Sequence, residues 1–330
     1  MKDLLQKLTE TYGPSGSEEQ IRSLITHELT GLVDDVRVDP LGNLIAVKRG
    51  TGGGRKVMLA AHTDEIGVIV THVDEKGFLR FSPIGGVNTL TLLGHRAVFA
   101  DGTMGTFGLE KLESNKERPD LDKFYLDIGA TSKGSASVKI GDVAAFSRPF
   151  VQLGGRFMAK AMDDRSGCAV VLETLRRLGT SPHEVHAVFT VQEEVGLRGA
   201  RTSAFGVDPD LALAVDVTLT GDTPEARTMS VSLGQGPAIK VKDSGMLTHP
   251  AVKGLLVHAV EAEGIPYQLE VLEGGTTDAT AMQTTKSGIP AGVVSIPCRY
   301  VHTPSEMVDA DDLENAVRLL VAVLSKPISL

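Results

Sequence analysis

The sequence predicts an α/β fold, with a mostly parallel sheet flanked by helices and a small all-β domain inserted into it. After residue 158, apolar strand-like runs alternate with segments of helical periodicity, which is typical of a parallel sheet covered on both faces. Between about 67 and 157, short β-rich stretches are separated by glycine-containing turns, without a convincing long helix. We therefore expect an α/β domain formed by residues 1–66 and 158–330, and an inserted β domain at 67–157.

The elements before the insertion follow from local signals. Ser17-Glu18-Glu19-Gln20 has the form of a capping box and precedes apolar residues at helical spacing, so a helix is expected there. Residues 33–38 and 43–47 are predicted to be strands joined by the turn Asp39-Pro40-Leu41-Gly42. The next apolar run, Val57 to Ala61, is a further strand.

The insertion and the C-terminal part are assigned in the same way. Within the insertion, strands are expected at 68–70, 78–81, 97–100 and 143–146, with a polar interruption from Glu113 to Asp122. Beyond it, helical periodicity predicts helices at 166–178, 249–263, 277–287 and 310–325, the first of them stopping before Gly179. Apolar runs predict strands at 185–191, 211–217, 237–241, 267–272 and 291–296.

The composition is that of a soluble globular protein and excludes several functions. Of the 330 residues, 42% are hydrophobic and 23% are charged, and no apolar run approaches the ~20 residues of a membrane span. A net charge of −9 argues against nucleic acid or an acidic membrane as a partner, because phosphate binding needs a basic face. The N-terminus lacks the apolar stretch of a secretory signal, and two cysteines are too few for a disulfide framework, so we expect a cytoplasmic protein.

Polar side chains stand where apolar strands end. His62 follows the run that ends at Ala61, Glu194 follows the strand 185–191, and Asp216 follows the run that ends at Val215. The carboxyl ends of strands line the binding crevice of an open α/β sheet, so these positions can converge. Because imidazole and carboxylate groups suit zinc-type ions, the pattern indicates a metal site.

Asp163 and His302 extend this site to a pair of ions. Asp163 begins a helix, where a carboxylate can cap the helix or bridge two cations, and His302 lies in a loop after the strand 291–296. One ion would be held by His62, Asp163 and Asp216, and the other by Asp163, Glu194 and His302. Two ions about 3.5–4 Å apart can activate water and polarise a carbonyl at once.

Each of these positions also has a more ordinary explanation, and a rival chemistry exists. Glu193 and Glu194 either form a solvated acidic turn or divide the work, one binding metal and the other acting as general base toward metal-activated water. Asp64 is placed to accept the second N–H of a metal-bound His62. A Cys298–His302 nucleophile pair is a further alternative, which no oxyanion-hole sequence accompanies.

In their order along the chain, these residues lie in segments that resemble the tetrahedral (TET) aminopeptidases, the glutamyl-aminopeptidase-like branch of the dinuclear zinc or cobalt exopeptidases. The segments are Ala61-His62-Thr63-Asp64-Glu65-Ile66-Gly67, Asp163-Asp164-Arg165, Gln192-Glu193-Glu194-Val195-Gly196-Leu197-Arg198-Gly199-Ala200, Val215-Asp216 and Arg299-Tyr300-Val301-His302-Thr303-Pro304. Gly13-Pro14-Ser15-Gly16, Asp39-Pro40-Leu41-Gly42-Asn43-Leu44 and Gly274-Gly275-Thr276-Thr277-Asp278-Ala279 are also similar to family segments.

This resemblance, which covers essentially the whole chain, implies a zinc-exopeptidase-like fold and an aminopeptidase that removes N-terminal residues from short peptides. It implies two divalent ions per subunit, zinc or cobalt, with ligation by His62, Asp163 (bridging), Glu194, Asp216 and His302, Glu193 as base, and Asp64 orienting His62. It also implies that the β insertion mediates dimerisation and that dimers assemble into a hollow dodecamer.

Other functions remain to be weighed against this one. An endoglucanase would use two carboxylates that flank a sugar bond and would need no metal, which leaves the histidines without a role. A non-enzymatic scaffold that binds partners through the insertion leaves the polar strand ends unexplained. A related metal-dependent deacylase or carboxypeptidase is the closest rival.

Overall fold

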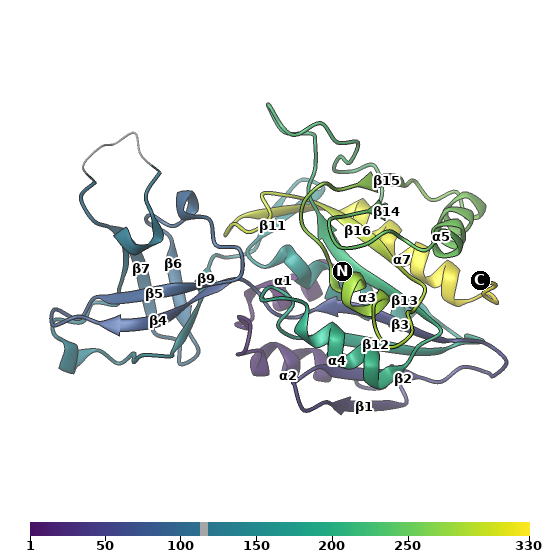
Figure 1. Cartoon of the computed structure of the whole chain (residues 1–330), viewed down its shortest axis with the longest axis horizontal. Coiled ribbons are helices and arrows are strands. Elements are labelled where there is room, and N and C mark those ends of the chain that lie inside the picture. Colours follow the sequence, from purple (N-terminus) through teal and green to yellow (C-terminus); the bar gives the residue numbers. More distant parts are fainter. Residues whose placement is uncertain (113–117) are drawn as a thin grey trace.

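The computed structural model describes residues 1–112 and 118–330, which form an α/β domain and a β-barrel lying side by side (Figure 1). Both marked chain ends lie on the α/β domain, and the chain leaves it for the barrel and returns. The described residues contain no helix of the length and hydropathy that a membrane crossing requires.

The sheet of the α/β domain is mixed. Its central strands run parallel, in the order β12 (Glu184–Thr190), β3 (Lys56–His62), β13 (Leu211–Thr218) and β16 (Ala291–Arg299). The margins are antiparallel, with β1 (Asp35–Val38) and β2 (Leu44–Lys48) on one side and β17 (Glu306–Asp309), β11 (Arg156–Ala159) and β10 (Val151–Leu153) on the other. β14 (Ala238–Lys242) pairs antiparallel with β16 and parallel with β15 (Gln268–Val271). The expected parallel sheet is therefore found at the centre, and antiparallel strands are added on both sides of it.

Helices cover both faces of this sheet. One face packs against α1 (Lys2–Glu10), α2 (Glu19–Glu28), α3 (Met162–Arg177), α5 (Pro250–Ala262) and α7 (Ala310–Leu324). The other packs against α4 (Arg198–Val207) and α6 (Asp278–Gln283). Alternate residues of β3 enter opposite cores, Leu59 the first and Met58 and Ala60 the second. His62 continues the second set and so emerges on the α4/α6 face.

The inserted domain is a closed antiparallel barrel with its own aromatic core. Its strands are β4 (Gly67–Val73), β5 (Leu79–Ile84), β6 (Arg96–Phe99), β7 (Met104–Leu109), β8 (Phe124–Asp127) and β9 (Val143–Ser147), closed in the order β4-β5-β8-β7-β6-β9. Inside, the Phe107 ring lies 5.3 Å from Phe81 and 5.7 Å from Phe146. The expected 67–157 segment also holds β10 and the start of β11, which pair in the main sheet. Of the polar interruption expected at 113–122, residues 113–117 lie outside the described part.

Several elements differ from their sequence-based expectation. Helix α2 begins at Glu19 with Glu18 at its N-cap and no capping hydrogen bond from a side chain, so the capping box predicted at Ser17 is wrong. The Glu18 carboxylate instead accepts the N–H of Gly16 at 2.6 Å. Helix α6 ends at Gln283, before the predicted 287, because Thr284, Thr285 and Gly288 favour a turn. Helices α1 and α4 are additional to those that the sequence predicts.

A buried ion pair joins the two points where the chain crosses between the domains. Glu65 precedes the barrel and Lys160 follows it, and their side chains meet at 2.7 Å with 2% and 4% of their surfaces exposed. Glu65 also accepts the N–H of Gly13 at 3.1 Å. The fully buried Arg165 lies 3.6 Å from the same carboxylate and donates to the carbonyls of Leu8, Thr11 and Thr63, so it ties the N-terminal segment to this crossing.

Candidate metal centre

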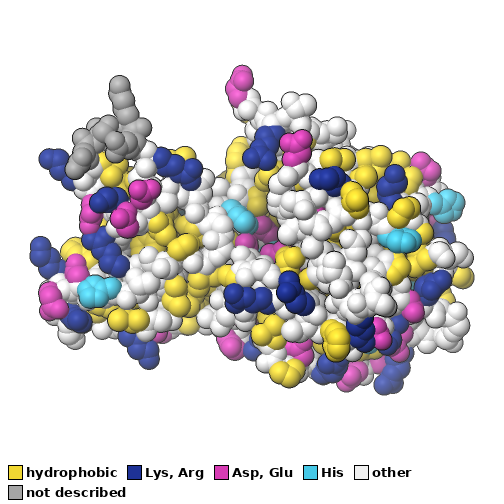
Figure 2. Space-filling model, viewed as in Figure 1, with side chains coloured by type: hydrophobic (Ala, Val, Ile, Leu, Met, Phe, Trp, Pro, Cys, Tyr) yellow, Lys and Arg dark blue, Asp and Glu magenta, His cyan; other side chains and the backbone are white. Residues whose placement is uncertain are grey.

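The polar strand ends converge on one cavity of about 540 Å³. The sequence-predicted ligands His62, Asp163, Glu194, Asp216 and His302, and the predicted base Glu193, all line it. His62 is the last residue of β3, Asp216 lies near the end of the neighbouring parallel strand β13, and Glu194 follows the end of β12. Acidic side chains and a histidine are visible where the barrel meets the α/β domain (Figure 2). The prediction that these distant residues converge is therefore confirmed.

Asp163 lies between the two histidines. Its Oδ1 is 2.9 Å from Nε2 of His62, and its Oδ2 is 3.3 Å from Nε2 of His302. His302 Nε2 is also 3.1 Å from Oε2 of Glu194, and His62 Nε2 is 3.9 Å from Oδ1 of Asp216. The two oxygens of the Asp163 carboxylate thus face different histidines, one His62 and the other His302.

The donor atoms group as a metal centre requires. Two sets lie within ligand distance of one another, His62 with Asp164 and Asp216, and His62 with Asp163 and Glu194. Asp164 is already engaged, because its carboxylate accepts the N–H of His62 at 3.2 Å and that of Gly167 at 2.9 Å. Asp163 is the better candidate ligand of the two, since its oxygens face imidazole nitrogens. The peptide bond between the two aspartates is cis.

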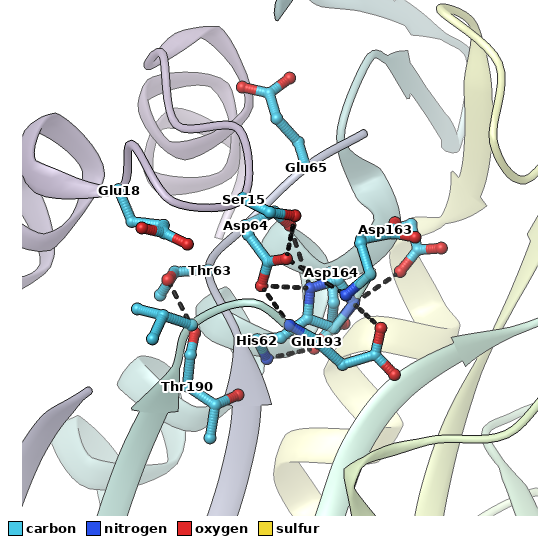
Figure 3. Close-up of polar contacts among 12 residues, drawn as sticks. Ser15, Glu18, His62, Thr63, Asp64, Glu65, Asp163, Asp164, Thr190 and Glu193 are labelled. Atoms are coloured by element: carbon cyan, nitrogen blue, oxygen red, sulfur yellow. Dashed lines mark hydrogen bonds and ion pairs between the residues drawn. The ribbon is translucent and has the colours of Figure 1, made fainter. Parts of the chain in front are cut away.

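Asp64, two residues after the end of β3, binds the backbone of both glutamates, and Figure 3 shows it beside Ser15, His62 and Glu193. Its carboxylate accepts the backbone N–H of Glu193 at 3.0 Å and of Glu194 at 3.2 Å, and the hydroxyl of Ser15 at 2.6 Å. The ring Nδ1 of His62 lies 3.0 Å from the backbone carbonyl of Asp64 and 3.6 Å from its carboxylate. Asp64 therefore supports His62 mainly through its main chain, while its side chain aligns the glutamates.

Glu306 has the equivalent position on the opposite side of the site, and no sequence pattern distinguishes it. One oxygen of this buried carboxylate accepts the N–H of Asp163 at 3.0 Å, and the other accepts that of His302 at 2.7 Å. Its sequence context, a short strand after a turn, resembles that of many structural glutamates. Asp278, which lies in one of the family-like segments, is also buried, with one oxygen accepting from Thr190 at 2.5 Å and the other without a hydrogen-bond partner among the described residues.

The electrostatics of the cluster favour bound cations. Burial, and then the nearby Asp216, raise the pKa of Asp164 well above its usual range, and burial raises the pKa of Glu193 and of Asp216 in the same way. Burial opposes ionisation of His302, but its contacts with Asp163 and Glu194 outweigh that effect and raise its pKa to about 12. The site holds more buried carboxylates than imidazoles, so hard or borderline divalent cations fit the donor set.

The cysteines do not form a rival nucleophilic centre. Both are free and fully buried, and burial raises the pKa of each thiol. A nucleophilic cysteine requires a lowered pKa and access to substrate. Cys298 has neither property, which rules against the Cys298–His302 alternative.

An α/β sheet with two histidines and a set of buried carboxylates gathered where its parallel strands end is typical of metal-dependent hydrolases. Residues 42–319 match the M42 glutamyl aminopeptidase family. A putative aminopeptidase of Acetivibrio thermocellus is 51% identical over 326 residues, 98% of each chain. Among solved structures, the aminopeptidase APDkam598 of the archaeon Desulfurococcus kamchatkensis superposes with a TM-score of 0.94 at 42% identity, covering 98% of this chain and 94% of that one. The Pyrococcus horikoshii TET1 peptidase gives a TM-score of 0.88 at 33% identity, covering 98% and 99%.

The chain therefore belongs to the M42 glutamyl aminopeptidase family. It is a metal-dependent aminopeptidase, a hydrolase that acts on peptide bonds. The glycosidase alternative does not agree with these relatives, nor with carboxylates that cluster around two imidazoles.

Proposed function

We propose that each subunit holds two divalent ions, zinc or cobalt, and uses them to remove N-terminal residues from short peptides. The observation that carries the proposal is the position of Asp163, whose two oxygens face two different imidazoles at 2.9 and 3.3 Å. We assign His62 and Asp216 to one ion, Glu194 and His302 to the other, and Asp163 to both. The same arrangement supports a zinc-exopeptidase-like description of the fold.

The residues around the ions divide the chemistry. When bound, such a pair of ions lowers the pKa of a water molecule and polarises a substrate carbonyl. Glu193 borders the cavity, with its Oε2 4.0 Å from Nε2 of His62 and 11% of its side chain exposed. Its carboxylate accepts the proton of the attacking water as the C–O bond forms. It then donates that proton to the amine as the peptide C–N bond breaks, so protons balance over the reaction.

Glu193 needs a fixed position for both transfers, and its main chain provides one. The N–H groups of Glu193 and Glu194 are both bound by Asp64, which is itself held by Ser15. The carboxylate of Glu193 therefore extends from an anchored backbone, which supports its assignment as the base. Apolar residues such as Leu197, Leu272 and Val301 line the same cavity and exclude water around the substrate.

The proposal is tested by removing and restoring the metal. The purified enzyme is stripped with a chelator, reloaded with Zn²⁺ or Co²⁺, and assayed on a panel of amino-acid anilides and on an N-acetylated peptide. We expect activity to vanish on stripping and to return with two ions per chain, on free N-termini only. Activity that survives complete stripping, or saturates at one ion, contradicts the two-ion assignment. Preferential cleavage of the acetylated peptide instead supports a deacylase.

We also propose that the chain self-associates, as dimers that build a dodecamer, with contacts supplied by the barrel. The P. horikoshii TET1 peptidase can assemble into a tetrahedron or a large octahedral shell. On the barrel of this chain, Leu90, Leu93 and Met104 expose 65%, 60% and 44% of their surface. Apolar side chains so exposed are suited to contacts between copies of the chain.

We also propose a cytoplasmic location, which the pair of free thiols supports.

A further inference from the structure

We infer that the inserted barrel is part of the catalytic site, because its Gly86 positions the ring of His302 for the ion shared by Glu194 and His302. This inference rests on the two-ion function proposed above. It adds a positioning role for a domain that contributes no assigned ligand, and it restricts that role to one of the two ions.

The contact is made by the loop that follows β5. Gly85 and Gly86 leave the barrel and lie against the metal centre. A Cβ atom on Gly86 would lie 2.8 Å from Cε1 of His302 and closer still to its Nδ1, and a Cβ on Gly85 would lie 3.1 Å from Oε2 of Glu194. Separations under 3 Å are not tolerated by real Cβ atoms, so the ring must move if Gly86 gains a side chain. The loop therefore touches the two side chains that we assign to the same ion.

The two histidines of the site are oriented by different means. The ring of His62 is 2% exposed, and its Nδ1 lies 3.0 Å from the carbonyl of Asp64, which fixes the ring plane. The ring of His302 is 35% exposed, and its Nδ1 has no hydrogen-bond partner within residues 1–112 and 118–330. Its Nε2 faces Asp163 and Glu194, and its backbone N–H donates to Glu306, but among the described residues neither contact restrains the Nδ1 side of the ring. Packing against Gly86 thus supplies the restraint that a hydrogen bond supplies to His62.

Gly86 is suited to a clean test. It lies in an exposed loop, and its φ is outside the left-handed region, so the backbone accepts alanine and the effect of Gly86→Ala is steric. Gly134 is a matched control, since it lies in the same barrel domain, has an ordinary φ, and has no atom within 4 Å of the place where an alanine Cβ would lie. Gly85 has a φ of 73° and would add backbone strain, so it is the poorer choice.

The experiment measures metal affinity in the full-length protein. Metal-free wild type, Gly86→Ala and Gly134→Ala are titrated with Co²⁺ by calorimetry, and the unfolding midpoint of each metal-free form is recorded. We expect Gly86→Ala to weaken one binding event about 10- to 100-fold, as loss of support for a metal-bound histidine does, and to leave the other unchanged. The metal-free midpoint should not change, and Gly134→Ala should match the wild type throughout.

A double-mutant cycle separates this role from a general structural effect. His302→Ala removes the side chain through which Gly86 is inferred to act, so Gly86→Ala should have no further effect on Co²⁺ binding in that background. Equal weakening of both ions, or an additional loss in the His302→Ala background, overturns the inference. Wild-type affinity at both ions in Gly86→Ala also overturns it. Failure of the wild type to bind two ions instead refutes the proposed function.

Discussion

Glu193 and Glu194 are adjacent but have unlike tasks in the proposed mechanism. Glu193→Gln keeps the size of the side chain but cannot accept a proton, so we expect turnover to fall about 10²–10⁴-fold. Both ions should remain, because Glu193 ligates neither. Glu194→Gln is the matched control and should lose one ion. The measurements are metal content and the rate of anilide hydrolysis, and near-normal turnover of Glu193→Gln with both ions present would remove it as the base.

In the proposed two-ion site, Asp163 is the one residue assigned to both ions. Asp163→Asn removes the negative charge and replaces one of the two oxygens that face the imidazoles by an NH₂ group, which cannot bind a cation. We expect both ions to be released or loosely held. Elemental analysis after gel filtration checks this result, and two retained ions per chain would show that Asp163 is not the bridge.

At the level of elements, the crossing between the domains depends on a buried charge. Glu65→Gln leaves the buried ammonium of Lys160 without its counter-charge, and breaking a buried pair typically lowers the free energy of unfolding by about 3–5 kcal/mol. Urea denaturation of the metal-free protein measures the change. The control is Glu110→Gln, which removes the exposed pair with Arg80 and should have little effect. Equal stability of both variants would show that Glu65 does not support the crossing.

The elements also show which features the sequence can predict. His62, Glu194 and Asp216 are predictable, because each stands where an apolar run of the sequence gives way to polar residues. Helix α7 is predictable from its apolar periodicity, and α5 from its high content of apolar residues. Helix α4 is not, since its residues are mostly small or polar and its apolar stripe is short.

The site residues that the sequence does not predict are those whose roles depend on contacts between distant segments. Glu306 reaches the backbone of Asp163 and His302, and Gly86 packs on the ring of His302. Neither residue has a local pattern that distinguishes it from an ordinary strand or turn residue. Their roles follow from the placement of the barrel and of β17, which only the folded chain reveals.

For the molecule as a whole, the barrel is expected to control particle size. Replacing residues 67–147, the barrel itself, by a Gly/Ser linker removes the exposed apolar side chains assigned to self-association. Light scattering should then report smaller particles than for the full chain. A variant with Leu90 and Leu93 changed to serine is a less drastic change, and its particles should also be smaller than those of the unaltered chain. An unchanged large particle would place the assembly contacts in the α/β domain.

The excess of buried carboxylates in the centre leads us to expect that the thermal stability of this protein depends on the concentration of free divalent metal. An ion bound only by the folded chain adds free energy by mass action, about 4 kcal/mol when its free concentration is a thousand times the dissociation constant. The unfolding temperature should therefore rise with the logarithm of free Zn²⁺ or Co²⁺, and Asp163→Asn should flatten that rise. Scanning calorimetry in metal buffers checks this, and a midpoint independent of metal would contradict it. On this expectation, metal supply would determine how much of the protein stays folded as well as how fast it works.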